Sequence, residues 1–148
     1  MQFLSKKISD LGIGWNERTL TMADAYRLCK RFRIVVQEMP LTTGGFYYRV
    51  MGRDFIAVDS RLAEPKKLFV LFHELGHYLL HTPESGATAN FHGVGRRTRK
   101  EREADIFALC CIIPRPQIET RSAQDLIDDG HPIAIIEARF KAYARYGL

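Results

Sequence analysis

Two histidines and a glutamate lie within five consecutive residues, His73–Glu74–Leu75–Gly76–His77. If this stretch is helical, His73 and His77 lie one turn apart on one face, so their imidazoles can converge on a single metal ion. Glu74 lies beside them and can take a proton from water that the metal holds. Two histidines at this spacing with an adjacent glutamate are typical of zinc hydrolases.

The alternative interpretation is a buried helix that contains two histidines by chance. At this composition the pattern arises by chance in about one chain in a hundred. A buried trio of ionisable groups is also costly unless the groups are paired or bound to a metal. Gly76 costs ~1 kcal/mol relative to Ala in a helix interior, which favours a close approach by another element. We therefore predict a zinc site, with Glu74 as the catalytic base.

A catalytic zinc ion needs a third protein ligand and one open position for water. A histidine ten residues after the first would be one option, but that position holds Pro83. His81 lies about 12 Å along the helix axis from His73 and cannot share the same ion. We expect His81 either to cap the end of the helix or to lie at the surface.

A second predicted helix offers three acids, Glu101, Glu103 and Asp105. Glu101 and Asp105 share one face with Ala104, which is small enough to pack closely against Gly76. Glu103 points to the opposite side of that helix, where we expect it to be solvated. We predict Glu101 as the third metal ligand and Asp105 as an acceptor for a histidine N–H, which would fix the orientation of the ring.

The elements that position these residues follow from apolar patterns and turn residues. We expect helices over about 20–32, 65–81, 98–113, 123–128 and 132–146, and strands over 33–38, 46–51 and 54–59. Gly12 and Gly14 argue against a long helix in the first 18 residues, and Gly52–Arg53 predicts a tight hairpin between the last two strands. The order predicts a single α+β domain over residues 1–148, with a small, mostly antiparallel three-stranded sheet packed on helices.

The composition excludes several classes of protein. Hydrophobic residues make up 46% and charged residues 26%, which is ordinary for a globular chain, and no apolar run is long enough to span a membrane. The start of the chain lacks a signal-peptide core, and three cysteines cannot all pair, so we expect reduced thiols in the cytoplasm. The net charge of +5 and the cluster Arg96–Lys100 could serve nucleic acid. Without a reading helix or aromatic platform, we favour a solvated loop and expect no direct nucleic-acid binding.

The stretch His73-Glu-Leu-Gly-His77-Tyr-Leu-Leu-His81, followed by Glu101-x-x-Ala-Asp105-x-Phe-Ala and an apolar run that ends at Pro114, resembles the ImmA/IrrE family of metallopeptidases. The resemblance covers residues 69–114. It implies a minimal zincin-like fold, a zinc ion held by two histidines and one glutamate, and cytoplasmic proteolysis. It also implies a regulatory protein as substrate, such as a helix-turn-helix repressor.

The chain departs from the family's usual residues at three places. Phe72 replaces a small residue before the first histidine, and Cys111-Ile-Ile-Pro114 replaces Leu-Leu-Met-Pro, so both changes exchange apolar for apolar. Asp105 replaces the commoner asparagine and keeps an acceptor. Members often carry a preceding helix-turn-helix domain, and we expect this chain to be the stand-alone form.

Two functions from different classes remain open. The leading hypothesis is a zinc endopeptidase, and the alternative is a zinc-containing regulatory binding module, an anti-repressor that captures a partner without cutting it. Glu74 favours the enzyme, because metal binding alone does not need it. Val58 and its neighbours could form an edge strand that pairs with an extended peptide. The candidates for a donor to the oxyanion of the transition state are Tyr47, Tyr48, Tyr78, His92 and His131.

Overall fold

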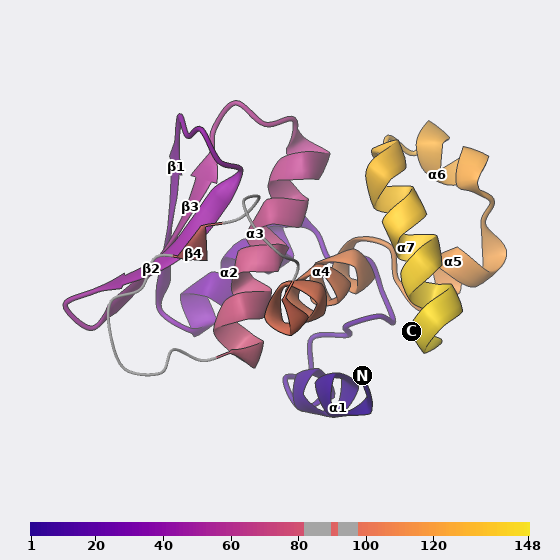
Figure 1. Ribbon diagram of the computed structural model, residues 1–148, viewed down its shortest axis with the longest axis horizontal. Helices are drawn as coiled ribbons and strands as arrows, with labels where there is room; N and C mark the ends of the chain where they lie inside the picture. The colour runs from indigo at the N-terminus through magenta and orange to yellow at the C-terminus, as the bar shows by residue number, and fades with distance from the viewer. Residues whose placement is uncertain (82–89, 92–97) are drawn as a thin grey trace.

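The computed structural model describes residues 1–81, 90–91 and 98–148. In chain order its elements are α1 (Gln2–Ser9), α2 (Met22–Arg31), β1 (Ile34–Met39), β2 (Gly45–Val50), β3 (Arg53–Asp59), α3 (Glu64–Leu80), β4 (Asn90–Phe91), α4 (Arg99–Ile112), α5 (Arg115–Thr120), α6 (Ala123–Asp128) and α7 (Ile133–Tyr146). Figure 1 shows the sheet on one side of α3 and α4, with α5, α6 and α7 on the other side. None of the described helices is long and apolar enough to cross a membrane.

The strands form one mixed sheet in the order β1-β3-β2-β4. β3 pairs in parallel with β1 and antiparallel with β2, and the two-residue β4 pairs antiparallel with β2. Two of these three pairings within the described residues are therefore antiparallel. Together with the helices packed on the sheet, they confirm the expected α+β class.

β3 is a central strand, so the prediction that Val58 belongs to an edge strand is wrong. Ile56, Ala57 and Val58 are all buried, a continuous apolar run that is typical of a strand flanked on both sides. The expected hairpin between β2 and β3 is present. Its two turn residues, Met51 and Gly52, both have positive φ and lie one residue earlier than predicted.

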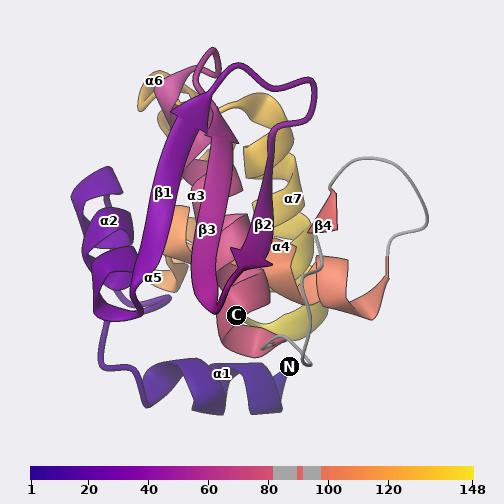
Figure 2. The ribbon, with the colours of Figure 1, turned by 90° about the vertical axis from the view of Figure 1, so that its left-hand side faces the viewer.

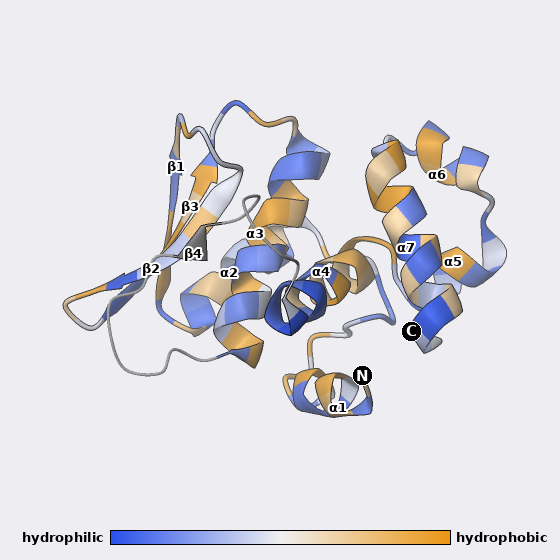
Figure 3. Ribbon diagram, viewed as in Figure 1, coloured by the Kyte–Doolittle hydropathy of each residue, from blue (hydrophilic) through white to orange (hydrophobic). Residues whose placement is uncertain are grey.

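Helices cover one face of the sheet. Figure 2 shows β1, β3 and β2 in front of α3, α4 and α7. Along α4 the character changes from hydrophilic at its start to hydrophobic toward its end (Figure 3). The hydrophobic end of α4 therefore lies in the core, while its first turns can carry polar side chains toward α3.

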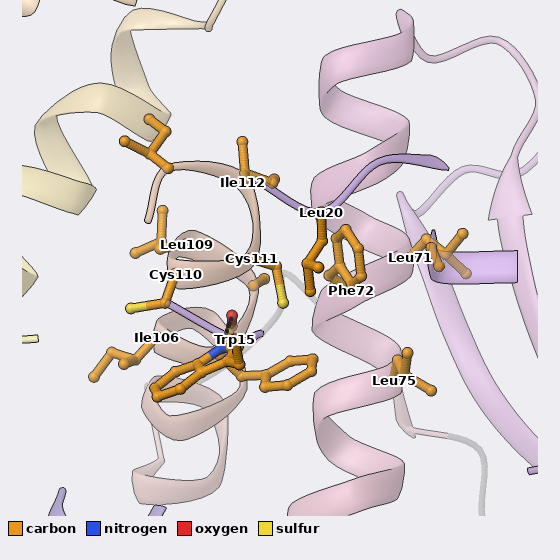
Figure 4. Close-up of a cluster of buried hydrophobic side chains, with 14 of the residues drawn as sticks. Trp15, Leu20, Leu71, Phe72, Leu75, Ile106, Leu109, Cys110, Cys111 and Ile112 are labelled. Atoms are coloured by element: carbon orange, nitrogen blue, oxygen red, sulfur yellow. Dashed lines mark hydrogen bonds between the residues drawn. The ribbon is translucent and has the colours of Figure 1, made fainter. Parts of the chain in front are cut away.

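The core between α3 and α4 is filled by large apolar side chains. Phe72 points from α3 toward α4 beside Leu20, whereas Leu71 and Leu75 point toward the sheet (Figure 4). Trp15 stacks on Phe107 and donates from Nε1 to the backbone oxygen of that residue at 3.0 Å. The three cysteines, Cys29, Cys110 and Cys111, are buried and form no disulfide, which agrees with the expected reduced thiols.

At Gly76, α3 and α4 approach each other closely. A Cβ added to Gly76 would meet Cδ1 of Phe107 at 2.9 Å and the Cα of Ala104 at 3.3 Å. Real Cβ atoms essentially never have neighbours at the first of these distances. The sequence-based expectation that a small residue of the second helix packs against Gly76 is thus confirmed.

Two short helices have no counterpart in the sequence-based prediction. α1 buries Leu4 and Ile8 and ends at Ser9, before Gly12, whose φ of 65° breaks the helix. α5 follows α4 closely, begins at Arg115 with Pro116 in its first turn, and buries Ile118. Such short helices give little periodic signal, because a helical repeat needs a window of about 11–18 residues. The equally short α6 was predictable because Ser122 and Asp125 form a capping box at its start, whereas α1 and α5 have no side-chain cap.

We expect Gly76→Ala to lower the free energy of unfolding. Alanine gains ~1 kcal/mol of helix propensity over glycine, but overpacking costs about 1–3 kcal/mol where backbone must move. Urea denaturation of the metal-free protein measures the sign of the change. Phe107→Ala removes the whole ring, including the Cδ1 atom that the new Cβ would meet, so Gly76→Ala should cost less stability in the Phe107→Ala background than in the parent. A variant more stable than the parent would show that the two helices are not in tight contact.

Candidate metal centre

His73 and His77 lie on the buried part of α3. Pro65 in the first turn suits the start of a helix, and nearly every residue from Leu71 to Leu79 is buried. The two imidazoles are only 6% and 5% exposed, and their ring centroids are 4.8 Å apart in an edge-to-face arrangement. The spacing of four residues therefore places both rings on one face, as the sequence predicted for a helix.

Three donor atoms converge on one point between α3 and α4. The Nε2 atoms of His73 and His77 are 3.1 Å apart. Oε2 of Glu101 lies 3.3 Å from Nε2 of His73, and Oε1 of Glu101 lies 3.0 Å from Nε2 of His77. Among the described residues these three form a group whose ligand atoms all lie within 4.8 Å of one another.

The spacing of these atoms fits a tetrahedral ion. Nitrogen and oxygen ligands about 2.0–2.1 Å from zinc lie about 3.3 Å from one another when their angles are tetrahedral. The observed separations of 3.0, 3.1 and 3.3 Å come close to this value. Two imidazoles and one carboxylate are also a donor set that suits zinc and leaves a fourth position open.

Glu101 lies in the first turn of α4, and the N-cap residue Thr98 fixes where this helix begins. The hydroxyl of Thr98, the N-cap residue, accepts a hydrogen bond from the Glu101 backbone N–H at 3.2 Å. Such a cap fixes the first turn of a helix and hence the direction of its side chains. The Glu101 side chain remains 29% exposed, so this side of the donor group is open to solvent.

Asp105 lies behind His73, on the side away from the donor group. Its Oδ1 is 2.7 Å from Nδ1 of His73, while Nε2 of the same ring faces Glu101. A carboxylate at this distance can accept the Nδ1 proton, which leaves the Nε2 lone pair for a metal. The structure thus places Asp105 where an acceptor for a histidine N–H would be needed.

Glu74 is fully buried beside His73 and is not a member of the three-residue donor group. Burying a carboxyl group costs free energy, so a glutamate at this position is unfavourable for packing alone. A carboxyl group held close to a metal site can act as a general base. Glu74 directly follows His73 in the sequence and lies outside the donor group found among the described residues.

Glu103 is not solvated, and that prediction is wrong. Its carboxylate is only 17% exposed, and its Oε2 lies 2.8 Å from Nε2 of His81. Oε1 accepts a hydrogen bond from Nε of Arg99 at 2.7 Å. Burial raises the pKa of Glu103, but the hydrogen bonds from His81 and Arg99 outweigh it, so the pKa lies below its usual value. A helical wheel of the second helix missed this pairing, because it treats every residue off the contact face as solvent-facing.

His81 caps the C-terminal end of α3, which is one of the two roles expected for it. It is the C-cap residue, and its backbone N–H donates to the His77 carbonyl at 2.9 Å. Its side chain is 10% exposed and therefore does not lie at the surface. Its Nδ1 lies 3.2 Å from Nδ1 of His77, a contact that the four-residue spacing between the two histidines could have indicated.

Two of the three tyrosines considered as oxyanion donors have hydroxyl groups that donate to side chains of the sheet. Tyr47 donates its hydroxyl to Asp54, and burial together with this carboxylate raises its pKa. Tyr48 donates to Gln37, and the ring of Tyr78 packs against Tyr47 with 5.9 Å between centroids. Burial raises the pKa of Tyr78 as well.

Two further candidates lie away from this cluster or outside the described residues. His131 lies between α6 and α7, and His92 lies outside the described residues. Of the basic cluster 96–100, the first two residues also lie outside them. Arg99 is 80% exposed and pairs with Glu103, which is the behaviour of a solvated helix start rather than of a built binding site.

Comparison with known proteins gives a match to a protein family. The family model Peptidase_M78, described as IrrE N-terminal-like domain, matches residues 29–145. The match extends from α2 to α7 and includes both helices that supply the donor group. No curated protein and no solved structure matches the chain.

We expect the purified protein to bind about one zinc ion per chain at the three-residue donor group. Glu101→Ala should lose this stoichiometric zinc, because two neutral imidazoles alone form an incomplete site. Elemental analysis after gel filtration measures the metal content. Glu137→Ala, which removes an exposed acid from α7, serves as the control and should keep its zinc. Equal zinc content in Glu101→Ala and the parent would exclude Glu101 as a ligand.

Proposed function

Because this chain belongs to the IrrE N-terminal-like peptidase family, we propose that it is a zinc-dependent endopeptidase that cleaves a regulatory protein. The family supports a metallopeptidase-like domain. The observation that carries the proposal is the convergence of Nε2 of His73, Nε2 of His77 and the Glu101 carboxylate within 3.0–3.3 Å of one another.

In this proposal His73, His77 and Glu101 hold the zinc ion. When bound, zinc supplies a Lewis acid that polarises the scissile carbonyl and lowers the pKa of water. Asp105 holds the His73 ring by accepting its Nδ1 proton, so that Nε2 stays directed at the donor group. The exposed edge of Glu101 leaves room for a peptide segment to reach this point from solvent.

Glu74 moves the proton in this mechanism. Its carboxylate accepts a proton from the attacking water and delivers it to the nitrogen of the leaving amine. Both transfers use the same oxygen atoms, so Glu74 returns to its starting state after each cleavage.

A helix-turn-helix repressor is the substrate that we propose, on the basis of the resemblance of the His73–His77 and Glu101–Asp105 segments to the ImmA/IrrE family. The alternative is an anti-repressor module that binds zinc and captures the same partner without cutting. The burial of Glu74 favours the peptidase, because a non-catalytic zinc site needs no further carboxyl group beside it.

We expect Glu74→Gln to retain zinc and the fold, because glutamine has the same shape and Glu74 is not a ligand. Peptide-bond cleavage should fall by about 10²–10⁴-fold, the usual contribution of a general base. The rate is measured on the intact substrate protein, with metal content and thermal unfolding as parallel readouts. Glu64→Gln, an exposed substitution at the start of the same helix, should cleave at the parental rate. Unchanged cleavage by Glu74→Gln would refute this mechanism.

The substrate class can be tested with two proteins in parallel. We expect the zinc-loaded enzyme to cut a helix-turn-helix repressor from a neighbouring gene at a defined site, and to degrade casein poorly. A folded partner can dock and present one segment, whereas casein offers none of this docking energy. Gel electrophoresis and mass spectrometry of the fragments follow the reaction, with Glu74→Gln as the blank. Rapid casein degradation beside an intact repressor would indicate a general peptidase, and tight binding without a cut would support the anti-repressor.

A further inference from the structure

His77 has a neighbour on the side away from the donor group, just as His73 has Asp105. That neighbour is another imidazole: Nδ1 of His77 lies 3.2 Å from Nδ1 of His81. Nε2 of His81 in turn lies 2.8 Å from Oε2 of Glu103. A continuous chain of three side chains therefore runs from the donor group to a carboxylate on α4.

The direction of the protons in this chain follows from the metal site. A neutral imidazole that offers Nε2 to a metal must carry its proton on Nδ1. His77 then donates from Nδ1, and Nδ1 of His81 must be the acceptor. His81 consequently carries its own proton on Nε2, where Glu103 accepts it. Each contact in the chain has one donor and one acceptor, with the carboxylate at the end.

We infer that His81 and Glu103 are positioning residues for His77: they fix its ring and its tautomer so that Nε2 faces the metal. This inference rests on the proposed zinc site and adds two residues to it. Partners of this kind, when removed, typically lower metal affinity by about 10–100-fold. The two histidine ligands are thus held differently, His73 by a carboxylate directly and His77 through an intervening imidazole.

Burial supports a role beyond that of a surface ion pair. The side chains of His81 and Glu103 are 10% and 17% exposed, so water competes little for their hydrogen bonds. Arg99, the other partner of Glu103, is 80% exposed and does not take part in the contact with His81. It therefore provides a matched control: its removal breaks a pair with Glu103 but leaves the path to His77 in place.

The test measures zinc affinity by competition with a chromophoric chelator. We expect His81→Leu and Glu103→Leu each to weaken zinc binding by about 10–100-fold. The double variant should lose little more than either single one, because both break the same chain. His81→Gln can accept from His77 and donate to Glu103, so it should recover most of the affinity. Arg99→Gln should stay within about twofold of the parent.

A second measurement uses the unaltered protein and does not depend on the variants folding. Long-range ¹H–¹⁵N correlation spectra of the zinc-loaded protein report which nitrogen of each imidazole carries the proton. We expect His81 as the Nε2–H tautomer and His77 protonated on Nδ1. An Nδ1–H tautomer of His81 would overturn the inference, as would zinc affinity of His81→Leu within twofold of the parent.

These outcomes separate this inference from the proposed function. If the parent binds zinc and cleaves its substrate while His81→Leu binds zinc equally well, only the positioning role fails. If His81→Gln and His81→Leu lose affinity equally, and the metal-free proteins unfold at equally lowered temperatures, His81 is a structural residue and the inference fails. If the parent binds no zinc at all, the proposed metal site fails and this inference fails with it.

Discussion

The contact of α3 and α4 at Gly76 determines where every polar group of the metal centre lies. The Cα of Ala104 and the ring of Phe107 occupy the space where any other residue would carry a Cβ. This approach places the first turn of α4 next to one turn of α3, so Glu101 reaches two imidazoles at 3.0 and 3.3 Å. A wider spacing would leave the carboxylate too far from the two rings, because its side chain spans only a few bonds.

Burial makes the charges of this centre depend on one another. Glu74 is fully buried and Glu101 is partly buried, and burial of a carboxyl group costs free energy. A divalent cation bound at the donor group would offset this cost for Glu101. Glu103 is balanced separately by Arg99, and Asp105 by the N–H of His73. The arrangement is therefore favourable as a metal site and costly as an ordinary core.

Several correct predictions follow from periodicity within one helix, whereas the contact of Ala104 with Gly76 follows from the small size of both residues. The shared face of His73 and His77 follows from 3.6 residues per turn, and so does the shared face of Glu101 and Asp105. The wrong expectations concern contacts between elements. The expectation that Val58 lies in an edge strand fails because the residues of a strand do not determine which strands it pairs with. The expectation that Glu103 is solvated fails because the end of α3 packs beside it. The sequence of α4 alone contains no sign of this contact.

The same distinction explains why the outer groups of the centre are harder to predict than the donor atoms. A metal imposes distances of a few ångströms on its ligands, so their spacing along a helix is restricted and recognisable. Groups that orient a ligand need only one hydrogen bond, and they can reach it directly, as Asp105 does, or through a second side chain, as Glu103 does through His81. Because α3 ends at Leu80, the His81 ring can turn back toward His77 while still meeting α4. The C-cap residue of α3, His81, thus lies where its side chain can hold His77, the second histidine ligand of the proposed site.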